Sequence, residues 1–323
     1  MKKIILVLFI LISSISFADN LSNIPAAFMD VGYGAKPMSM GGAYVSLTDN
    51  ANSIIWNPAG LCRISSKHNL SMDNVTFFDL YNYSFLGYGM KLNEMISLGS
   101  GLIYSGDEAM SEATLLVSMG LNGSIFGKPF LEKLNLGLSL KYFGSSFGNN
   151  SNGSYVDAQG EHQVSGSANG FGCDVGLQYK ITEESNVGLA CKNALNNIFW
   201  ESSNGTGTAQ GDYDEGIPTT LTYGYSFSKN NITFALDYDK ALYKDVEDIV
   251  HIGGEYTLLG KYLSLRSGFS QELYTSENRK YGFGVGTKLN IWQNSLLHFD
   301  VGYEIQPQWQ GGNTLRISMN IVK

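Results

Sequence analysis

The chain of 323 residues has only three cysteines and six prolines, and its basic residues form no cluster. Cys62, Cys173 and Cys191 are odd in number and widely spaced, so they do not suggest a disulfide framework. The lack of a Lys or Arg cluster in an acidic chain argues against nucleic acid as a partner. After the first 18 residues, no stretch approaches the ~18 uninterrupted apolar residues that indicate a membrane-spanning helix. If the protein resides in a membrane, we therefore expect it not to be helical there.

The first 18 residues have the parts of a secretory signal peptide. Lys2 and Lys3 form a basic start, an apolar core follows, and residues 16–18 have the small-x-small pattern of a cleavage site. The apolar run is shorter than the ~20 residues of a spanning helix, which argues against a membrane anchor. We therefore expect cleavage after Ala18 and export. The 21 basic residues, less Lys2 and Lys3, leave 19 against 29 acidic ones, a net charge of −10 for the exported chain.

The chain is rich in glycine and aromatic residues, which lie in segments of alternating polarity. It contains 38 Gly, 19 Tyr and 17 Phe, with only 15% charged residues. In KYGFGVGTKLNI, residues 280–291, one face is apolar and the other holds Gly, Lys and Asn. Such segments have the ~9–11 residues of a transmembrane strand, whereas soluble strands average ~5–6. Their length therefore favours a transmembrane β-barrel over a soluble antiparallel sandwich.

Fourteen such segments follow one another, an even number as a closed bacterial barrel requires. They cover, approximately, residues 66–77, 81–91, 95–106, 112–126, 131–147, 170–182, 185–197, 216–229, 231–243, 248–259, 262–273, 280–291, 296–307 and 313–323. In such barrels one end carries short turns and the other long loops. The two longest connections, 148–169 and 198–215, fall at the same end, and only 78–80 breaks the alternation. The sequence therefore predicts an all-β fold, a 14-stranded antiparallel transmembrane β-barrel over residues 66–323.

Residues 19–65 lack this alternation and are dense in glycine and small residues. A barrel of fourteen strands is wide enough to enclose an aqueous lumen or a plug. Glycines would let a folded segment approach the wall closely. We therefore predict an N-terminal hatch, or plug, inside the lumen. The candidate hatch residues are Gly41, Gly42, Trp56, Asn57, Pro58, Ala59 and Gly60.

GAKPMSMGGAYVSLTDNANSIIWNPAGL, residues 34–61, resembles the N-terminal signature of the FadL/TodX superfamily of outer-membrane transporters for hydrophobic compounds. It is most similar to the PorV/PorQ-like branch, and VGLACKNAL, residues 187–195, resembles a strand that recurs there. The resemblance implies a bacterial outer-membrane location and passive uptake of fatty-acid-like molecules. It also implies ligand capture by the third and fourth outer loops, a pocket near the hatch and a lateral gap in the wall. The alternative, drawn from PorV-like relatives, is a binding or scaffold protein for secretion or surface attachment, with a secreted protein as partner.

Two sets of candidate site residues belong to this hypothesis. The apolar residues of the long loops are the candidates for ligand capture: Val156, Ile198, Phe199 and Trp200. The polar faces of the strands supply a charged lumen wall: Asp174, Asp237, Glu255, Arg266, Lys288, Asp300, Glu304 and Arg316. Charges of both signs indicate ion pairs around a plug rather than an ion-selective channel. We therefore expect an apolar ligand to bind where the hatch meets the wall.

No motif indicates catalysis, a metal or a cofactor. GSSFG, residues 144–148, matches the G-x-S-x-G pattern, but that motif needs a strand–turn–helix context and a polar loop follows here. An outer-membrane lipase would need Ser146 together with His162, His251 or His298, and neither spacing nor local sequence supports one. The histidines are scattered and form no metal-binding pattern. We therefore expect no catalytic residues, no metal and no cofactor.

Overall fold

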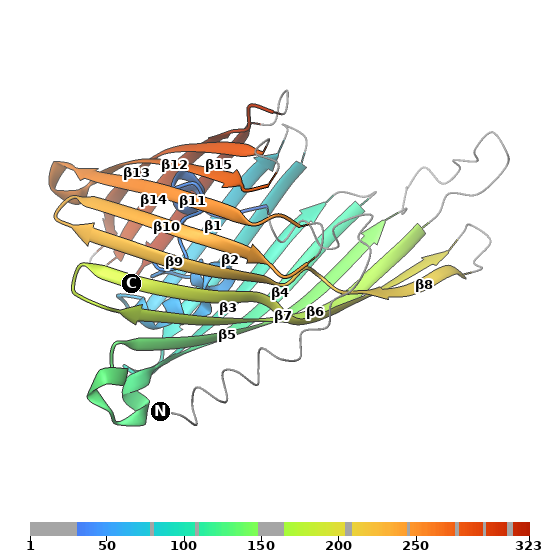
Figure 1. Cartoon of the computed structure of the whole chain (residues 1–323), viewed down its shortest axis with the longest axis horizontal. Helices are drawn as coiled ribbons and strands as arrows, with labels where there is room; N and C mark the ends of the chain where they lie inside the picture. Colours follow the sequence, from blue (N-terminus) through green and yellow to red (C-terminus); the bar gives the residue numbers. More distant parts are fainter. Residues whose placement is uncertain are drawn as a thin grey trace.

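A computed structural model describes residues 31–77, 81–106, 110–147, 165–203, 209–243, 246–274, 278–292, 295–308 and 313–323. Within them a single antiparallel sheet closes into a barrel (Figure 1). Neighbouring strands are consecutive in the chain, except that β7 (Ser185–Ser203) also pairs with β9 (Thr220–Lys229). The ring closes where β1 (His68–Phe77) pairs with β15 (Thr314–Val322). None of the helices in the described part of the chain has the length and apolar character needed to cross a membrane.

The barrel wall consists of fourteen strands, as the sequence predicted, and β8 is an additional short strand beside β7. The bounds are β1 His68–Phe77, β2 Tyr81–Lys91, β3 Ile96–Gly106, β4 Met110–Asn122, β5 Leu134–Phe147, β6 Ser165–Lys180, β7 Ser185–Ser203, β8 Ala209–Glu215, β9 Thr220–Lys229, β10 Ile232–Ala241, β11 Ile249–Leu258, β12 Leu263–Glu272, β13 Arg279–Trp292, β14 Ser295–Ile305 and β15 Thr314–Val322. The 3-10 turns η3 Gly123–Phe126, η4 Pro129–Leu131 and η5 Leu259–Lys261 lie between strands.

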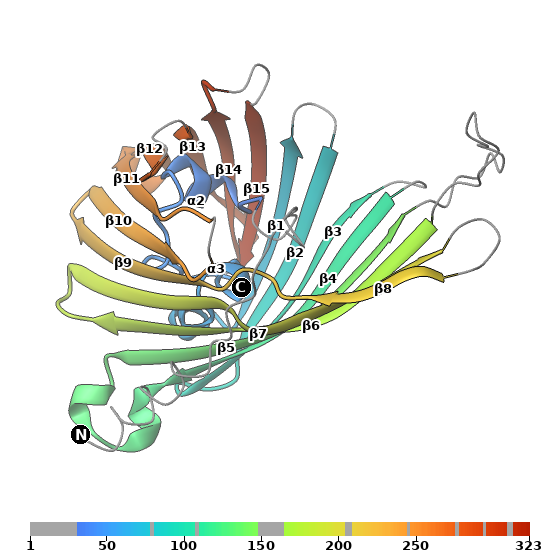
Figure 2. The same cartoon turned by 45° about the vertical axis from the view of Figure 1, so that its right-hand side comes forward.

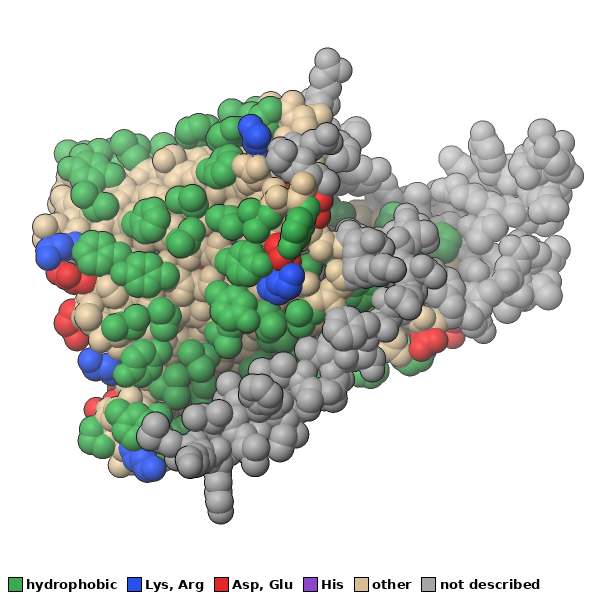
Figure 3. Space-filling view, viewed as in Figure 1, with side chains coloured by type: hydrophobic (Ala, Val, Ile, Leu, Met, Phe, Trp, Pro, Cys, Tyr) green, Lys and Arg blue, Asp and Glu red, His purple; other side chains and the backbone are tan. Residues whose placement is uncertain are grey.

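The strands alternate between an apolar outer face and a different inner face. In β4, Leu115 and Val117 are 55% and 64% exposed, whereas Leu116 and Ser118 between and beside them are buried. Figure 3 shows hydrophobic side chains spread over the outside of the barrel, with charged ones toward its two ends. An apolar outer belt with polar ends is the surface that a bilayer requires of a barrel.

The β6–β7–β8 region corrects the predicted loops. The sequence predicts loops over 148–169 and 198–215, but β6 already begins at Ser165 and β7 continues to Ser203, where β8 returns along it. Figures 1 and 2 show these three strands extending beyond the others at the end with the long connections. The prediction was wrong because Ser, Asn and Gly are poor strand formers, and cross-strand pairing overrides that weak preference.

A bulge in β7 separates two halves of the strand with different partners. Residues 185–192 pair with β9, whereas residues 198–203 pair with β8. Between them, residues 192–194 lie opposite the single residue Asp174 of β6, and Asn193 adopts φ 55°. Extra residues in one strand bend it and increase its twist. The outer half of β7 therefore leaves β9.

Residues 31–65, which we call the inner segment, lie inside the barrel (blue in Figures 1 and 2). The segment contains α2 Ala35–Ser39, α3 Ser53–Trp56 and the 3-10 helix η2 Pro58–Arg63. Contacts of α2 are with β12 to β15, and those of η2 are with β2 to β6. The segment therefore reaches across the lumen from one side of the wall to the other.

Candidate functional site

Side chains on the inner faces of several strands hydrogen-bond to the inner segment. The carboxylate of Asp237 in β10 accepts the backbone N–H groups of Tyr44 and Val45 at 2.7 and 2.8 Å. The guanidinium of Arg316 in β15 donates to the carbonyl of Gly32 at 3.0 Å. Other wall side chains that bond the segment are Asn69, Asp73, Ser139, Gln178, His251 and Ser318. These residues belong to strands around the barrel, so the segment is held from several directions.

Asn57 links the inner segment to β6. Its side-chain amide donates to the carbonyl oxygens of Val45 at 2.9 Å and of Leu177 in β6 at 3.1 Å. Its Oδ1 accepts the N–H of Ala59 at 3.2 Å, which caps the start of η2. A Cβ at Gly176 in β6 would lie 2.0 Å from this Oδ1, so glycine there makes room for the amide. The fully buried Asn57 therefore both stabilises the conformation of the inner segment and attaches it to β6.

The predicted hatch residues all lie in the inner segment. Gly41 and Gly42 form the turn after α2, Trp56 ends α3, and Asn57 precedes η2, in which Pro58, Ala59 and Gly60 lie. Residues 19–30 of the predicted hatch lie outside the described part of the chain. That the segment closes the lumen to solutes stays a prediction.

Inward-facing glycines in β11 to β14 receive the inner segment. A Cβ at Gly268 in β12 would lie 2.1 Å from the backbone nitrogen of Gly41, and one at Gly282 in β13 would lie 2.2 Å from the carbonyl oxygen of Met38. Real Cβ atoms do not approach a backbone so closely, so a larger residue would displace the segment. Glycine on this face therefore allows the backbone of the segment to pack directly on the wall.

Arg266 lies at the centre of an ion-pair network on the inner face of β11 to β14. Its Nε pairs with the carboxylate of Glu255, and its Nη1 lies 2.6 Å from Oδ1 of Asp300. Arg316 and Glu304 form a second, looser pair at 3.6 Å. Because a buried charge is costly without a partner, pairing makes this charged wall tolerable inside the barrel.

A third ion pair holds the bulge of β7. The ammonium of Lys141 in β5 lies 2.6 Å from Oδ1 of Asp174 in β6, and both side chains are almost fully buried. The same carboxylate accepts the backbone N–H of Asn193 at 2.7 Å, and the carbonyl of Asn193 accepts the hydroxyl of Thr219 at 2.8 Å. Asp174 was predicted from sequence as a lumen residue, but its partners lie on other strands and only the fold reveals them.

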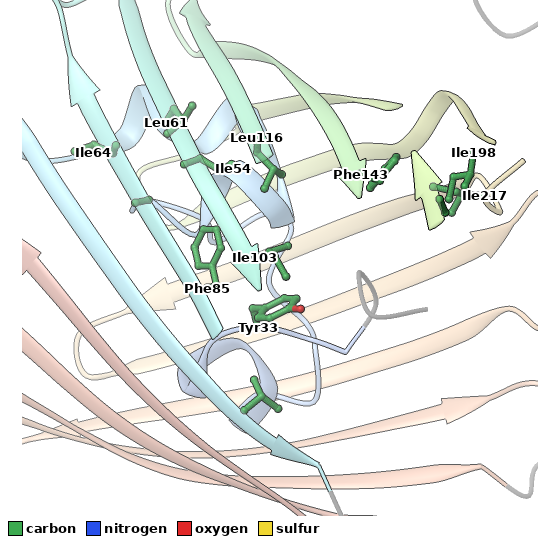
Figure 4. Packing of buried hydrophobic residues seen from close by; sticks show 13 residues of the cluster. Tyr33, Ile54, Leu61, Ile64, Phe85, Ile103, Leu116, Phe143, Ile198 and Ile217 are labelled. Atoms are coloured by element: carbon green, nitrogen blue, oxygen red, sulfur yellow. The ribbon is translucent and has the colours of Figure 1, made fainter. Parts of the chain in front are cut away.

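The inner face of β1 to β5 carries an apolar patch next to polar residues such as Asp73 and Lys141. Val75, Phe85, Ile103, Leu116 and Phe143, one from each strand, are at most 2% exposed. They form one buried cluster with residues of the inner segment and of the β7 region (Figure 4). Those further members include Tyr33, Ile54, Leu61, Ile64, Ala168, Ile198 and Ile217.

The sequence analysis did not predict this apolar patch, because it considered only the charged residues of the inner faces. A signal was present: segments 81–91, 96–106 and 112–121 each place a large apolar residue, Phe85, Ile103 or Leu116, on the face that otherwise carries mostly small or polar residues. In an aqueous pore the inner face of such strands would be polar. Apolar residues on both faces therefore indicate strands that also pack against something inside.

The inner segment separates two cavities. The loop-side cavity, of 220 Å³, is bounded by Trp56 and the turn after α2, and by strand ends next to the long connections, where Lys192, Asp239 and His251 lie. The turn-side cavity, of 280 Å³, is bounded by strand ends next to the short turns. Since α2 contributes Met38 to the loop-side cavity and Lys36 and Pro37 to the turn-side cavity, this helix stands between them.

The loop-side cavity combines an apolar surface with charged groups of both signs, among which Lys192 lies against the apolar part. The Lys192 ammonium lies 5.0 Å from the centroid of the Trp56 ring, and Trp56 Nε1 donates to the carbonyl of Tyr33 at 2.9 Å. Tyr33, Ile55 and Trp56 supply apolar surface to this cavity. Among the described residues, Lys192 has no carboxylate within salt-bridge distance. The site therefore offers a hydrophobic wall beside an ammonium group.

The turn-side cavity is polar. Lys36, Tyr44, Asp73, Lys288 and His298 line it. Within the described part of the chain, Tyr44 Oη, Asp73 Oδ1 and His298 Nε2 have no hydrogen-bond partner. Lys288, a predicted lumen residue, has no carboxylate within salt-bridge distance among the described residues. These groups suit water rather than an apolar ligand.

Titratable groups of the inner segment keep the charge states that their surroundings impose. Burial alone would lower the pKa of Lys36, but Glu255, Tyr44 and Asp49 together outweigh it and raise that pKa. Burial raises the pKa of the Tyr44 phenol, which stays neutral. Burial likewise raises the pKa of the Cys62 thiol to about 12, so this cysteine is a poor nucleophile at neutral pH.

The predicted capture residues are dispersed. Ile198, Phe199 and Trp200 lie in β7 instead of a loop; Ile198 is buried in the apolar cluster, and Phe199 is 50% exposed. Trp200 packs against that cluster, and Val156 lies outside the described residues. Ser146 of the G-x-S-x-G match lies in β5, with its hydroxyl 3.0 Å from that of Ser111. In the described residues, His, Cys, Asp and Glu form no group that could hold a metal ion.

No protein-family model matches the chain, and no curated protein matches it. Solved structures do. The chain is similar to the CymD monoaromatic hydrocarbon channel, with a TM-score of 0.58, 16% identity, and coverage of 90% of this chain and 96% of that one. The P. putida toluene transporter TodX has the same TM-score and identity, with 90% and 98% covered, and a Pseudomonas aeruginosa FadL homologue reaches 0.56 at 10% identity, with 90% and 98% covered. The chain therefore has the fold of the FadL/TodX-type channels.

Proposed function

We propose that the protein is a bacterial outer-membrane channel for the passive uptake of hydrophobic small molecules, exported after cleavage at Ala18. The apolar cluster inside the lumen carries this proposal. The inner face of a water-filled pore is polar, whereas this one carries the buried residues Phe85, Ile103 and Leu116. The apolar outer belt and the fold shared with hydrocarbon channels also support it.

The cluster offers a route along one side of the barrel. It extends from Ile217 and Ile198 beside the β7 bulge, past Phe143 and Leu116, to Ile64 at the end of η2 (Figure 4). In the present arrangement Ile54 and Leu61 of the inner segment cover the middle of this surface. A shift of the segment would uncover it, and an apolar ligand could replace the contacts at ~25 cal/mol per Å² of buried surface. The inner segment would thus act as the hatch.

We further propose that the ligand is amphipathic, with a fatty-acid-like chain and an anionic head. The ammonium of Lys192 over Trp56 would receive the head, and the apolar surface of the loop-side cavity would receive the start of the chain. An uncharged hydrocarbon would leave Lys192 without an ionic partner. Phe199 and Trp200, with Val156, would assist capture at the outer end.

The proposal is tested by uptake into liposomes that contain the protein. A long-chain carboxylate and the hydrocarbon of the same length are compared in wild type, in Lys192→Met, and in the control Lys229→Met, which changes an exposed turn lysine. We expect Lys192→Met to lower carboxylate uptake about tenfold, since a bond to a charged group contributes ~1.5–3 kcal/mol. Hydrocarbon uptake should not change. Equal uptake by liposomes with and without the protein would refute the channel itself.

A binding or scaffold role is the second candidate, and the β6–β7–β8 extension favours it. These strands project beyond the barrel and offer a platform that a pore does not need (Figure 2). A platform should co-purify in stoichiometric amount with an exported protein and should lose that partner when residues 198–215 are deleted. Co-purification with an acyl chain alone would favour the channel.

A further inference from the structure

His251 in β11 lies where the wall meets the turn of the inner segment after α2, beside the loop-side cavity. Its Nδ1 lies 2.7 Å from the carbonyl oxygen of Gly41, and its Nε2 lies 3.2 Å from Oδ2 of Asp239 in β10. Gly41 and Gly42 have φ of 66° and 88°, a left-handed turn that suits glycine. A Cβ at Gly42 would lie 2.7 Å from Nδ1, so glycine is what lets the ring approach the turn.

Both partners of the His251 ring can only accept hydrogen bonds. A backbone carbonyl and a carboxylate have no proton to donate, so each ring nitrogen must carry one for both bonds to form. Neutral imidazole has one N–H group and imidazolium has two. The observed geometry therefore satisfies both contacts only when His251 is positively charged.

The charged neighbours of His251 are mostly on the strands beside it. Asp237 lies directly opposite it in the register of β10, and Asp239 follows on the same face. On the other side β12 places the uncharged Ser270 opposite it. The remaining charged groups around the loop-side cavity are Lys192, Glu247, Glu272 and Lys280. The two aspartates on the paired strand favour the charged ring.

We propose that His251 is a protonation-dependent latch between the wall and the inner segment. While the ring holds two protons, it ties Gly41 to Asp239 and so to β10 and β11. When the pH rises and the ring loses one proton, only one of the two bonds survives, and the turn after α2 is held less firmly. As control over a channel, this inference rests on the function proposed above.

The latch is tested by amide hydrogen exchange of residues 41–45 in the full protein in lipid nanodiscs. Rates are measured at acidic and alkaline pH and corrected for the intrinsic effect of pH on exchange. In wild type we expect the protection of these amides to fall about tenfold or more as the pH rises, the size of effect that a hydrogen bond to a charged group has on an equilibrium.

Two variants separate the latch from a general loosening of the barrel. His251→Gln places its amide nitrogen near the position of Nε2, so it keeps Asp239, loses Gly41 and should be poorly protected at every pH. Asp239→Asn supplies a donor to a neutral ring, so both bonds persist without a second proton and protection should be high at every pH. His298→Gln, in the turn-side cavity, is the matched control and should behave as wild type.

If the protection of residues 41–45 in wild type did not fall with rising pH, the latch would be refuted. The latch would also be refuted if the same pH-dependent fall in protection persisted in His251→Gln or in Asp239→Asn. If His251→Gln does not fold, the Asp239→Asn result decides alone. Because exchange needs no ligand, a failure of uptake in liposomes would refute the proposed channel while leaving this measurement intact.

Discussion

At the scale of single residues, inward-facing glycines explain much of the composition. The 38 glycines of the chain include those at 253, 268, 282, 284 and 302, where an added Cβ would lie within 3 Å of the inner segment. These glycines are not turns; they lie within strands and leave room for another backbone. In these strands the apolar residues therefore face the bilayer, whereas the alternating glycines face the packed inner segment.

The close approach at Gly268 leads to a stability prediction. In Gly268→Ala the new methyl group would clash with the backbone of Met40 and Gly41, and overpacking of this kind typically costs ~1–3 kcal/mol. We expect a lower melting temperature, followed by the heat-dependent shift of the barrel on gels, together with higher ion conductance in planar bilayers. Gly254→Ala is the control, because the nearest atom to its Cβ would be 4.0 Å away. Equal behaviour of the two variants would contradict the packing.

At the scale of elements, the bulge of β7 shows how buried polar groups decide the path of a strand. Asp174, paired with Lys141, accepts the backbone N–H of Asn193, which has a left-handed conformation. Asn tolerates that conformation better than most residues. Above the bulge the strand takes β8 as its partner and extends away from β9.

Removing one member of this pair should destabilise the barrel. Lys141→Met leaves the carboxylate of Asp174 buried and unpaired, which typically costs ~3–5 kcal/mol. We expect a clear drop in the free energy of unfolding, measured in urea with the protein in lipid vesicles. Adding Asp174→Asn should recover part of the loss. The exposed pair of Lys180 and Glu183 is the control, and Lys180→Met should change little; a similar effect of both single substitutions would contradict the role of burial.

At the scale of the whole molecule, the lumen has two unlike halves. The inner faces of β10 to β15 carry charged residues, of which Asp237 and Arg316 bind the inner segment. The inner faces of β1 to β5 each contribute one large apolar residue to a patch that packs against it. Polar side chains on both sides hold the segment by directional bonds, whereas the apolar patch offers a surface without directional demands. A segment bound in this way could move along the apolar side while its polar contacts limit where it goes.

Deletion of residues 19–60 tests the segment as a plug. The fourteen strands close by pairing among themselves, so we expect the shortened protein to form a barrel. With the segment gone, the two cavities on either side of it would join into one passage, and ion conductance in planar bilayers should rise strongly. A conductance like that of the full protein would mean that the segment does not occlude the lumen.

Sequence alone determined the class of fold, the number of wall strands and which face of each strand is outside. These features follow from a local property of the sequence. Side chains alternate across a strand, so a segment with an apolar face long enough to span the bilayer can be identified from its own residues. Local amino-acid composition predicted the structure less well where pairing between strands decides whether a segment is a strand or a loop. This is why residues 198–203 and 209–215 were expected to be a loop and instead form strands.

Only the tertiary structure decided which inward-facing side chains contact one another and the inner segment. The bonds of Asp237 to the turn near Tyr44, of Asn57 to β6 and of His251 to Gly41 each join residues more than a hundred positions apart. The apolar patch in the lumen is likewise a property of closure, because it assembles from one residue on each of several strands. A sequence shows which side chains face inward, but the curvature and register of the closed sheet determine which of them meet.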